Sequence, residues 1–213
     1  MQVTLTTFLS VDGVMQGPGG PDEDRSGGFD RGGWLVPHFD DDAGRFMAEV
    51  FDKVDAFLLG RRTYDIFAAS WPKVTDPDDP IASRLNTLPK YVASTTLAAP
   101  AWHNTTIIKG DVIAEVARLK EKPGRELQVH GSGTLARTLI ENDLVDEMRL
   151  LVFPVIVGAG RRLFPDAGVA TGLRLVDSHT TSTGTAIHVY RLTGRPEFGE
   201  FELAADLPTS QSL

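Results

Sequence analysis

Short apolar runs alternate with amphipathic stretches along most of the chain. Runs with the length and residue types of strands lie at residues 3–9, 54–60, 90–95, 105–108 and 127–130. Between them, apolar residues recur at helical spacing, as in Phe46, Met47, Val50 and Phe51. We expect helices over residues 40–53, 61–70, 81–88, 111–121 and 134–141.

The end of the chain has a different pattern. Residues 145–157 form a long apolar strand region broken at Pro154, and residues 173–177 and 185–192 are typical of a closing antiparallel pair. Strands that alternate with helices and are followed by strands alone predict an α/β fold. Its central sheet should be mostly parallel, with helices on both faces and an antiparallel C-terminal edge.

Two segments, residues 13–33 and residues 196–213, show neither helical nor strand periodicity. Residues 13–33 hold eight glycines and two prolines and predict a long loop, which in a compact domain is usually functional or mobile. The chain of 213 residues is long enough for one packed core and short for two ordinary domains. We assign residues 1–195 to one domain and residues 196–213 to a C-terminal tail.

Composition limits the function classes. Lys and Arg total 21 against 29 Asp and Glu, and a net charge of −8 repels nucleic acid and anionic lipid, so neither is an expected partner. The chain has no cysteine, which excludes disulfides, thiolate zinc sites and a cysteine nucleophile. Its five histidines lack metal-ligand spacing, so no metal site is expected. Without a membrane-spanning run or a signal-peptide pattern, the expected location is the cytoplasm.

Three predicted strands end in polar or glycine-rich turns. The turns begin with Gly60-Arg61-Arg62-Thr63, with Ser94-Thr95 and with Gly131-Ser132-Gly133-Thr134-Leu135. In an open α/β sheet, ligands bind beyond the carboxyl ends of the strands, and free N–H groups at helix starts attract phosphate. Any one of these could equally be an ordinary connection, but together they predict a site for the pyrophosphate and ribose of a dinucleotide.

Arg61 and Arg62 begin a predicted helix, where a cation opposes the helix dipole. A bound phosphate would explain them, because a guanidinium can grip a phosphate with two hydrogen bonds. The alternative is a solvated pair that bridges to Asp55 or Asp65.

Asp12 follows the first predicted strand and should emerge at the same edge. A carboxyl group there could orient a substrate N–H or relay a proton. The alternative, which the residues alone favour, is an Asp that caps its own turn, with Gly13 supplying a positive φ.

Four motifs together resemble the dihydrofolate reductase-like superfamily over about residues 1–192. Leu58-Leu59-Gly60-Arg61-Arg62-Thr63-Tyr64 resembles the Gly-Arg-x-Thr-aromatic run of dihydrofolate reductases, and Val129-His130-Gly131-Ser132-Gly133 resembles their second glycine turn. Ser10-Val11-Asp12-Gly13, and Phe153-Pro154-Val155-Ile156-Val157-Gly158-Ala159-Gly160, look more like the reductase domain of the bifunctional riboflavin-biosynthesis deaminase/reductase.

The resemblance implies that NADPH lies across the sheet edge with its nicotinamide near Asp12, which would be the catalytic residue facing the substrate. The adenosine phosphate side would meet Gly60, Arg61, Arg62 and Thr63, with Ser94 and Thr95 nearby. The pyrophosphate would be lined by Gly131, Ser132, Gly133, Thr134 and Leu135. We place Trp34, Phe51, Pro154 and Gly158 in the substrate pocket, with His38, Trp71 and the loop at residues 158–162 as further candidates for its wall.

This sequence differs from each of the two reductases in one respect that bears on the functional hypothesis. The position of the pterin-binding carboxylate of dihydrofolate reductases falls at Gly44, and no deaminase domain is present. We therefore expect an NADPH-dependent reductase that transfers a hydride to a small pterin- or pyrimidine-like heterocycle. The alternatives are a non-catalytic NADP-binding module and, less favoured, a true dihydrofolate reductase. The resemblance and the many apolar residues at 145–157 also predict a homodimer.

Overall fold

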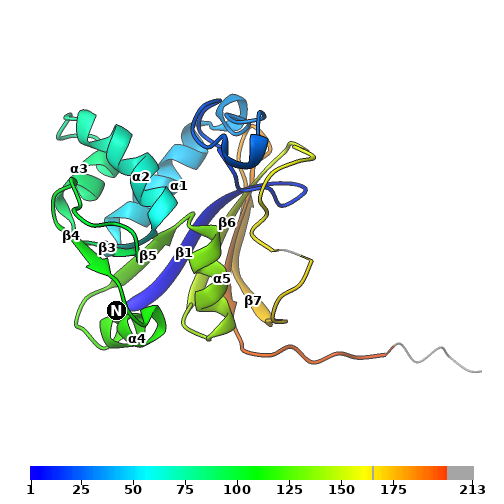
Figure 1. Ribbon diagram of the computed structural model, residues 1–213. Helices are drawn as coiled ribbons and strands as arrows, with labels where there is room; N and C mark the ends of the chain where they lie inside the picture. Colours follow the sequence, from blue (N-terminus) through cyan, green and yellow to red (C-terminus); the bar gives the residue numbers. More distant parts are fainter. Residues whose placement is uncertain (165, 201–213) are drawn as a thin grey trace, which may run out of the picture.

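A computed structural model describes residues 1–164 and 166–200, and within them the strands form one eight-stranded sheet (Figure 1). The strands are β1 (Gln2–Ser10), β2 (Val54–Gly60), β3 (Lys90–Ala93), β4 (Thr105–Ile108), β5 (Glu126–His130), β6 (Glu147–Phe153), β7 (Leu173–Thr180) and β8 (Ala186–Leu192). Their spatial order is β4-β3-β2-β5-β1-β6-β8-β7.

Strand direction agrees with the sequence prediction. The six strands from β4 to β6 pair in parallel, while β8 runs antiparallel to β6 and β7 antiparallel to β8. The α/β fold with an antiparallel C-terminal edge is therefore confirmed. Because β5 lies between β2 and β1, the carboxyl ends of these three strands meet at one edge.

Helices follow the strands at nearly the predicted positions. The α-helices are α1 (Asp41–Asp52), α2 (Arg61–Ser70), α3 (Pro80–Thr87), α4 (Val112–Lys120) and α5 (Gly133–Glu141), and short 3-10 turns lie at η1 (Ser26–Gly28), η2 (Val36–His38) and η3 (Trp71–Lys73). The side chains of Asp40, Asp79 and Asp111 cap α1, α3 and α4 by accepting backbone N–H groups. None of the described helices has the length and apolar character needed to cross a membrane.

The sheet separates two apolar layers. Phe57 and Leu59 of β2 face the layer that holds Phe51 of α1, whereas Leu58 faces the layer that holds Leu139 of α5. Covered on both faces, the parallel strands need apolar residues at successive positions. This explains why the sequence shows continuous apolar runs rather than alternation.

Strand β6 ends earlier than the predicted region, because Phe153 is its last residue and Pro154 follows. Val145, Met148, Leu151 and Val157 are all buried within the chain itself. Much of the apolar richness of residues 145–157 thus has an explanation inside one subunit, although Ile156 is 74% exposed, and the homodimer stays a prediction. The C-terminal edge strand β7 is instead exposed along its whole length.

The predicted tail, residues 196–213, is described only in part. Residues 196–200 form neither helix nor strand, and residues 201–213 lie outside the described residues.

A buried charge network crosses the three central strands. The guanidinium of Arg149 on β6 donates to Glu126 on β5 at 2.8 and 2.9 Å and to Glu147 at 2.7 and 3.0 Å. Thr4 of β1 donates to the same Glu126 carboxylate at 3.1 Å. The Arg149 side chain is only 5% exposed, so the charges depend on one another for compensation.

Replacing Arg149 with Ala should therefore lower the free energy of unfolding by about 3–5 kcal/mol, because two carboxylates lose their buried partner. Urea denaturation measures the change. Arg118→Ala removes an exposed pair with Glu115 on α4 and should change stability little. Equal small losses in both variants would contradict a structural role for the network.

Candidate functional site

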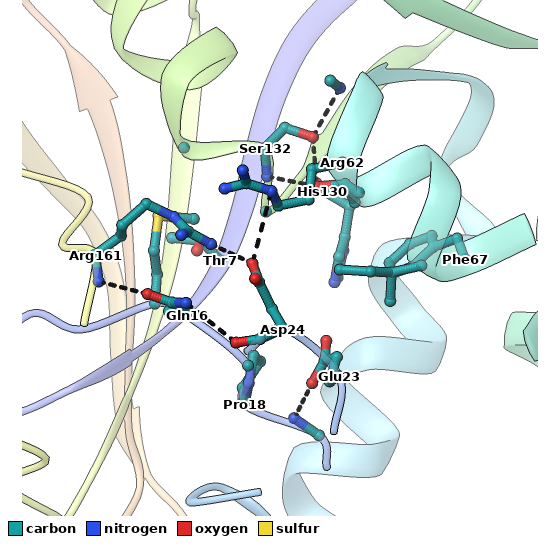
Figure 2. Close-up of a pocket in the computed structure, with 18 of the residues that line it drawn as sticks. Thr7, Gln16, Pro18, Glu23, Asp24, Arg62, Phe67, His130, Ser132 and Arg161 are labelled. Atoms are coloured by element: carbon teal, nitrogen blue, oxygen red, sulfur yellow. Dashed lines mark hydrogen bonds and ion pairs between the residues drawn. The ribbon is translucent and has the colours of Figure 1, made fainter. Parts of the chain in front are cut away.

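A cavity of about 1130 Å³ opens at the carboxyl edge of β1, β2 and β5 (Figure 2). Thr7 and Phe8 of β1 line it, together with much of the loop from Met15 to Asp24. The predicted cofactor residues that line it are Gly60, Arg61, Arg62, Thr63, Gly131, Ser132, Gly133, Thr134 and Leu135. The structure thus brings both predicted turns to one hollow, although they are about seventy residues apart in the chain.

Ser132 joins the two turns. Its hydroxyl accepts the Gly60 N–H at 3.0 Å and donates to the His130 carbonyl at 3.0 Å, while its own N–H donates to Thr63 Oγ1 at 3.2 Å. Gly131 and Ser132 both lie in the left-handed region, with φ of 56° and 53°. A non-glycine residue there is strained, so these hydrogen bonds hold a turn that the backbone alone would not favour.

The helices that start at these turns have free N-terminal N–H groups. In both α2 and α5 the residue before the helix makes no side-chain cap, and neither helix has an acidic residue in its first turn. At Gly133, an added Cβ would lie 2.5 Å from the sulfur of Met15, so a larger residue would require the Met15 side chain to move. Two uncapped helix starts at one cavity form an arrangement suited to phosphate.

Arg61 and Arg62 point to different places. Arg61 forms an ion pair with Asp65 at 2.7 Å and approaches Thr96 Oγ1 at 3.4 Å. It also lines a second hollow of about 350 Å³, together with Ser94, Thr95, Thr96 and Lys109. The Arg62 guanidinium lies 3.9 Å from the Asp24 carboxylate. Of the two pairings considered from the sequence, the bridge from Arg61 to Asp65 is present, whereas Asp55 pairs with Arg125 at 3.1 Å.

The glycine-rich loop is tied down around Gln16. The Gln16 amide donates to the carbonyls of Asp24 and Ser26, and its side-chain oxygen accepts the Arg161 N–H at 3.0 Å. Trp34 Nε1 donates to the Gln16 carbonyl at 2.8 Å. The loop therefore has a defined internal structure beside the cavity.

Asp24 adds an ion pair to this structure. Its side chain is 8% exposed and pairs with Arg161, which also donates to Ser26 Oγ at 2.7 Å. Burial raises the pKa of Asp24, but hydrogen bonds from Ser26 and the charges of Arg161 and Arg62 outweigh it and lower the pKa. Gln16 and Asp24 were not predicted, and the 158–162 loop was expected near the pocket without its Arg161 being joined to them, because no local pattern connects residues that are more than 130 positions apart.

Asp12 binds backbone rather than lining the cavity. Its carboxylate accepts N–H groups from Val157 at 3.0 Å and Gly158 at 2.8 Å, and the hydroxyl of Ser10 at 2.7 Å. Burial raises its pKa, but these hydrogen bonds outweigh burial and lower the pKa to about 2. Gly13 has a φ of 78°, so the geometry favours the alternative in which Asp12 is a turn residue. Its carboxylate also binds the backbone of the distant segment at Val157 and Gly158. Its catalytic role stays a prediction.

The four predicted substrate-pocket residues lie outside the lining of this cavity. Trp34 and Phe51 are buried in the core, and Pro154 and Gly158 are exposed on the segment after β6. Their role in a substrate pocket stays a prediction. The apolar wall of the cavity is formed by other residues, namely Phe8, Leu35, Phe67 and Trp71, with His130 beside them. Trp71 was a candidate from the sequence; Phe67 and His130 were not.

Sheet order, two-layer core and the joined turns define a dihydrofolate reductase-like α/β fold. Within this class, the chain belongs to the RibD C-terminal domain family, whose model matches residues 1–189. Among the described residues, no cluster of three or more histidines and carboxylates could hold a metal ion.

Two relatives come from Bacillus subtilis (strain 168). The uncharacterized protein YyaP is 29% identical over 195 residues, covering 91% of this chain and 96% of its own length. The uncharacterized protein YwjB is 27% identical over 158 residues, covering 74% and 85%.

Solved structures share the fold. A putative riboflavin biosynthesis protein from Shewanella sp. PV-4 superposes with a TM-score of 0.65 at 20% identity, covering 91% of this chain and 99% of its own. A pyrimidine reductase-like protein from Corynebacterium diphtheriae superposes with a TM-score of 0.58 at 12% identity, covering 90% and 92%.

Replacing Asp12 with Asn should destabilise the protein. The amide accepts only through its oxygen, so one of two backbone N–H groups loses its partner, at a cost of about 1–3 kcal/mol at pH 7. Because folding lowers the pKa from 3.8 to about 2, the carboxylate stabilises the fold fully above pH 3.8, and this contribution is lost as the pH falls through about 2.

Thermal and urea unfolding of wild type and variant at pH 7 and pH 3 measure this difference. Asp65→Asn, an exposed helix pair, is the control and should change stability little. If Asp12→Asn keeps the stability of wild type but loses turnover, the result would contradict the structural role and support the catalytic role that the resemblance implies.

Proposed function

We propose that this protein is an NADPH-dependent reductase that transfers a hydride to a small pterin- or pyrimidine-like heterocycle. The observation that carries the proposal is the pair of uncapped helix starts, α2 and α5, joined through Ser132 at one large cavity. Membership of the RibD C-terminal domain family and the reductase-like structural neighbour support an oxidoreductase.

The cofactor is assigned to the residues that fit each of its parts. Within the predicted turn Gly131–Leu135, the N–H groups of Gly131 and Ser132 already donate to Thr6 and Thr63, so Gly133, Thr134 and Leu135 at the start of α5 offer the backbone N–H groups for the pyrophosphate. Arg61, Ser94, Thr95 and Lys109 surround the second hollow with donors and two cations, which suits the extra phosphate of NADPH.

When bound, NADPH supplies the hydride, and the chain supplies position and shelter. Phe8, Phe67 and Trp71 give the cavity flat apolar walls against which a heterocycle can lie. The loop held by Gln16 and Asp24 borders the same space and limits the entry of water. The protein therefore mainly holds two rings in contact while the cofactor performs the chemistry.

The structure offers no support for a classical folate reductase. Among the described residues, none from α1 lines the cavity, and Gly44 occupies the position of the expected carboxylate. This absence also keeps open a binding module without turnover. NADPH oxidation against a panel of pterins, aminopyrimidines and quinones separates the two, because a module would oxidise NADPH with none of them.

Cofactor choice tests the assignment of Arg61. Arg61→Ala should weaken NADPH by about 10- to 150-fold, the effect of roughly 1.5–3 kcal/mol for one charge-assisted contact, and leave NADH nearly unchanged. Arg62→Ala is the matched variant: its side chain faces Asp24, so it should affect both cofactors by a similar, smaller factor.

Calorimetric titration of both cofactors at one fixed salt concentration measures these constants. Wild type that binds NADPH and NADH equally would overturn the assignment. So would an Arg61→Ala variant that loses both in proportion.

We also propose a homodimer, formed through β7 rather than through residues 145–157. Leu173, Leu175 and Val176 are 43%, 53% and 49% exposed on this edge strand, and burying apolar side chains of this kind against a partner would be favourable. The proposed partner is a second copy of this chain, because the resemblance to the riboflavin-biosynthesis reductase domain implies a homodimer.

Light scattering at micromolar concentration should give a dimer mass for wild type and a monomer mass for Leu175→Glu, since a charge would enter the interface. Val36→Glu changes an apolar residue that is 57% exposed on η2 and should leave the dimer intact. A monomeric wild type would contradict the proposal.

A further inference from the structure

His130 is the last residue of β5 and the residue immediately before the second glycine turn. Its side chain lies within an aromatic cluster, with ring centroids 5.5 Å from Phe8, 5.9 Å from Phe51 and 5.5 Å from Phe67. The residue is 8% exposed, and it lines the large cavity (Figure 2). A polar ring is thus set into the apolar wall of the site.

This ring lacks a partner that a buried imidazole normally has. Among the described residues, no group forms a hydrogen bond with its buried Nδ1. Leaving a buried polar atom unpaired costs about 1–3 kcal/mol, and native proteins satisfy nearly all such atoms. The amide oxygen of Gln128 is also unpaired, but Gln128 does not line the cavity.

Another buried polar group of the chain shows the usual pattern. Lys90 is fully buried, yet its ammonium donates to the carbonyls of Leu85 and Leu88 at 2.7 and 2.8 Å. The buried ammonium of Lys90 is thus paired away from the cavity, whereas the buried oxygen of Gln128 is not, so an unpaired atom alone does not mark a ligand site. His130 differs from Gln128 because its ring lines the cavity, where a ligand edge can meet the imidazole, directly or after a turn of the ring that brings the buried Nδ1 to the surface.

The surroundings also determine the charge of His130. Burial among aromatic rings lowers its pKa to about 4, so the ring is neutral at pH 7. A neutral imidazole has one N–H donor and one acceptor nitrogen. It suits a ligand edge that carries a carbonyl or ring N–H, and it gives no compensation to a buried carboxylate or phosphate.

We propose that His130 is a specificity-determining residue that hydrogen-bonds the edge of an uncharged planar heterocycle held beside Phe8 and Phe67. The inference rests on the proposed function and narrows its substrate class. The ring that accepts the hydride enters the aromatic wall without charge, and any charged substituent lies toward the open side of the cavity. A compound whose ring itself is ionised at pH 7 is excluded.

The test uses three uncharged probes, 6-methylpterin, lumazine and uracil, titrated against protein saturated with NADP⁺. At least one should bind wild type. His130→Phe keeps an aromatic ring and removes hydrogen bonding, so it should weaken that probe by about 3- to 10-fold, the effect of one neutral hydrogen bond. His130→Gln keeps a donor and an acceptor and should bind within about twofold of wild type.

A spectroscopic readout separates binding from packing. In protein labelled with ¹⁵N-histidine, the ring resonances of His130, assigned by their loss in His130→Gln, should shift when the probe is added. His188→Phe is the control, since His188 bonds to Ser178 on the far β7–β8 hairpin and should leave probe affinity unchanged.

Three results would overturn the inference: no binding of any of the three probes, unshifted His130 resonances, or equal affinity of wild type and His130→Phe. NADPH titration is independent of these outcomes. If NADPH binds and the probes do not, only this inference fails. If NADPH does not bind wild type, the proposed function fails, and probe titration of protein without cofactor still decides the role of His130.

Discussion

The two hydrogen bonds formed by the hydroxyl of Ser132 are the interactions on which the candidate site depends. The hydroxyl accepts from Gly60 at the start of α2 and donates to the carbonyl of His130 at the end of β5. One side chain therefore fixes the distance between two helix starts and the position of the residue that enters the aromatic wall. Without it, the sheet would still bring the two turns to the same edge, but their relative position would depend on packing alone.

The sheet makes that contact possible. Parallel pairing places the carboxyl ends of β2, β5 and β1 next to one another, and apolar layers on both faces keep the strands from shifting. The Arg149 network lies toward the opposite ends of β5, β1 and β6 and joins them by buried charge. The buried charge network thus lies at one end of these strands and the candidate site at the other.

Local patterns in the sequence were enough to predict the elements. Periodicity placed α2 at residues 61–70 and β2 at residues 54–60, the bounds that the structure shows. The turns at Gly60 and Gly131 could be predicted as neighbours, because strand ends in a parallel sheet share an edge. Asp40, Asp79 and Asp111 cap helices as short-range chemistry dictates.

The rest of the site depends on contacts that no local pattern encodes. His130 reads as an ordinary strand residue, and only the fold reveals that its ring lies among Phe8, Phe51 and Phe67 beside a cavity. Gln16 reads as one polar residue within a glycine-rich loop. Likewise, the apolar residues at 145–157 predicted an interface, and only the fold shows that many of them, such as Met148 and Leu151, are buried inside the subunit while Ile156 is exposed.

The position of Asp24 between two arginines restricts the order in which this site can change during evolution. Loss of Arg62 leaves the closer pair of Asp24 with Arg161 intact, so a lineage can tolerate that step first. Loss of Asp24 first leaves two guanidinium groups near each other without the buried carboxylate that balances them. The effect of a substitution at any one of these three positions should therefore depend on the residues at the other two, and removal of Asp24 should disturb the site more than removal of the exposed Arg62.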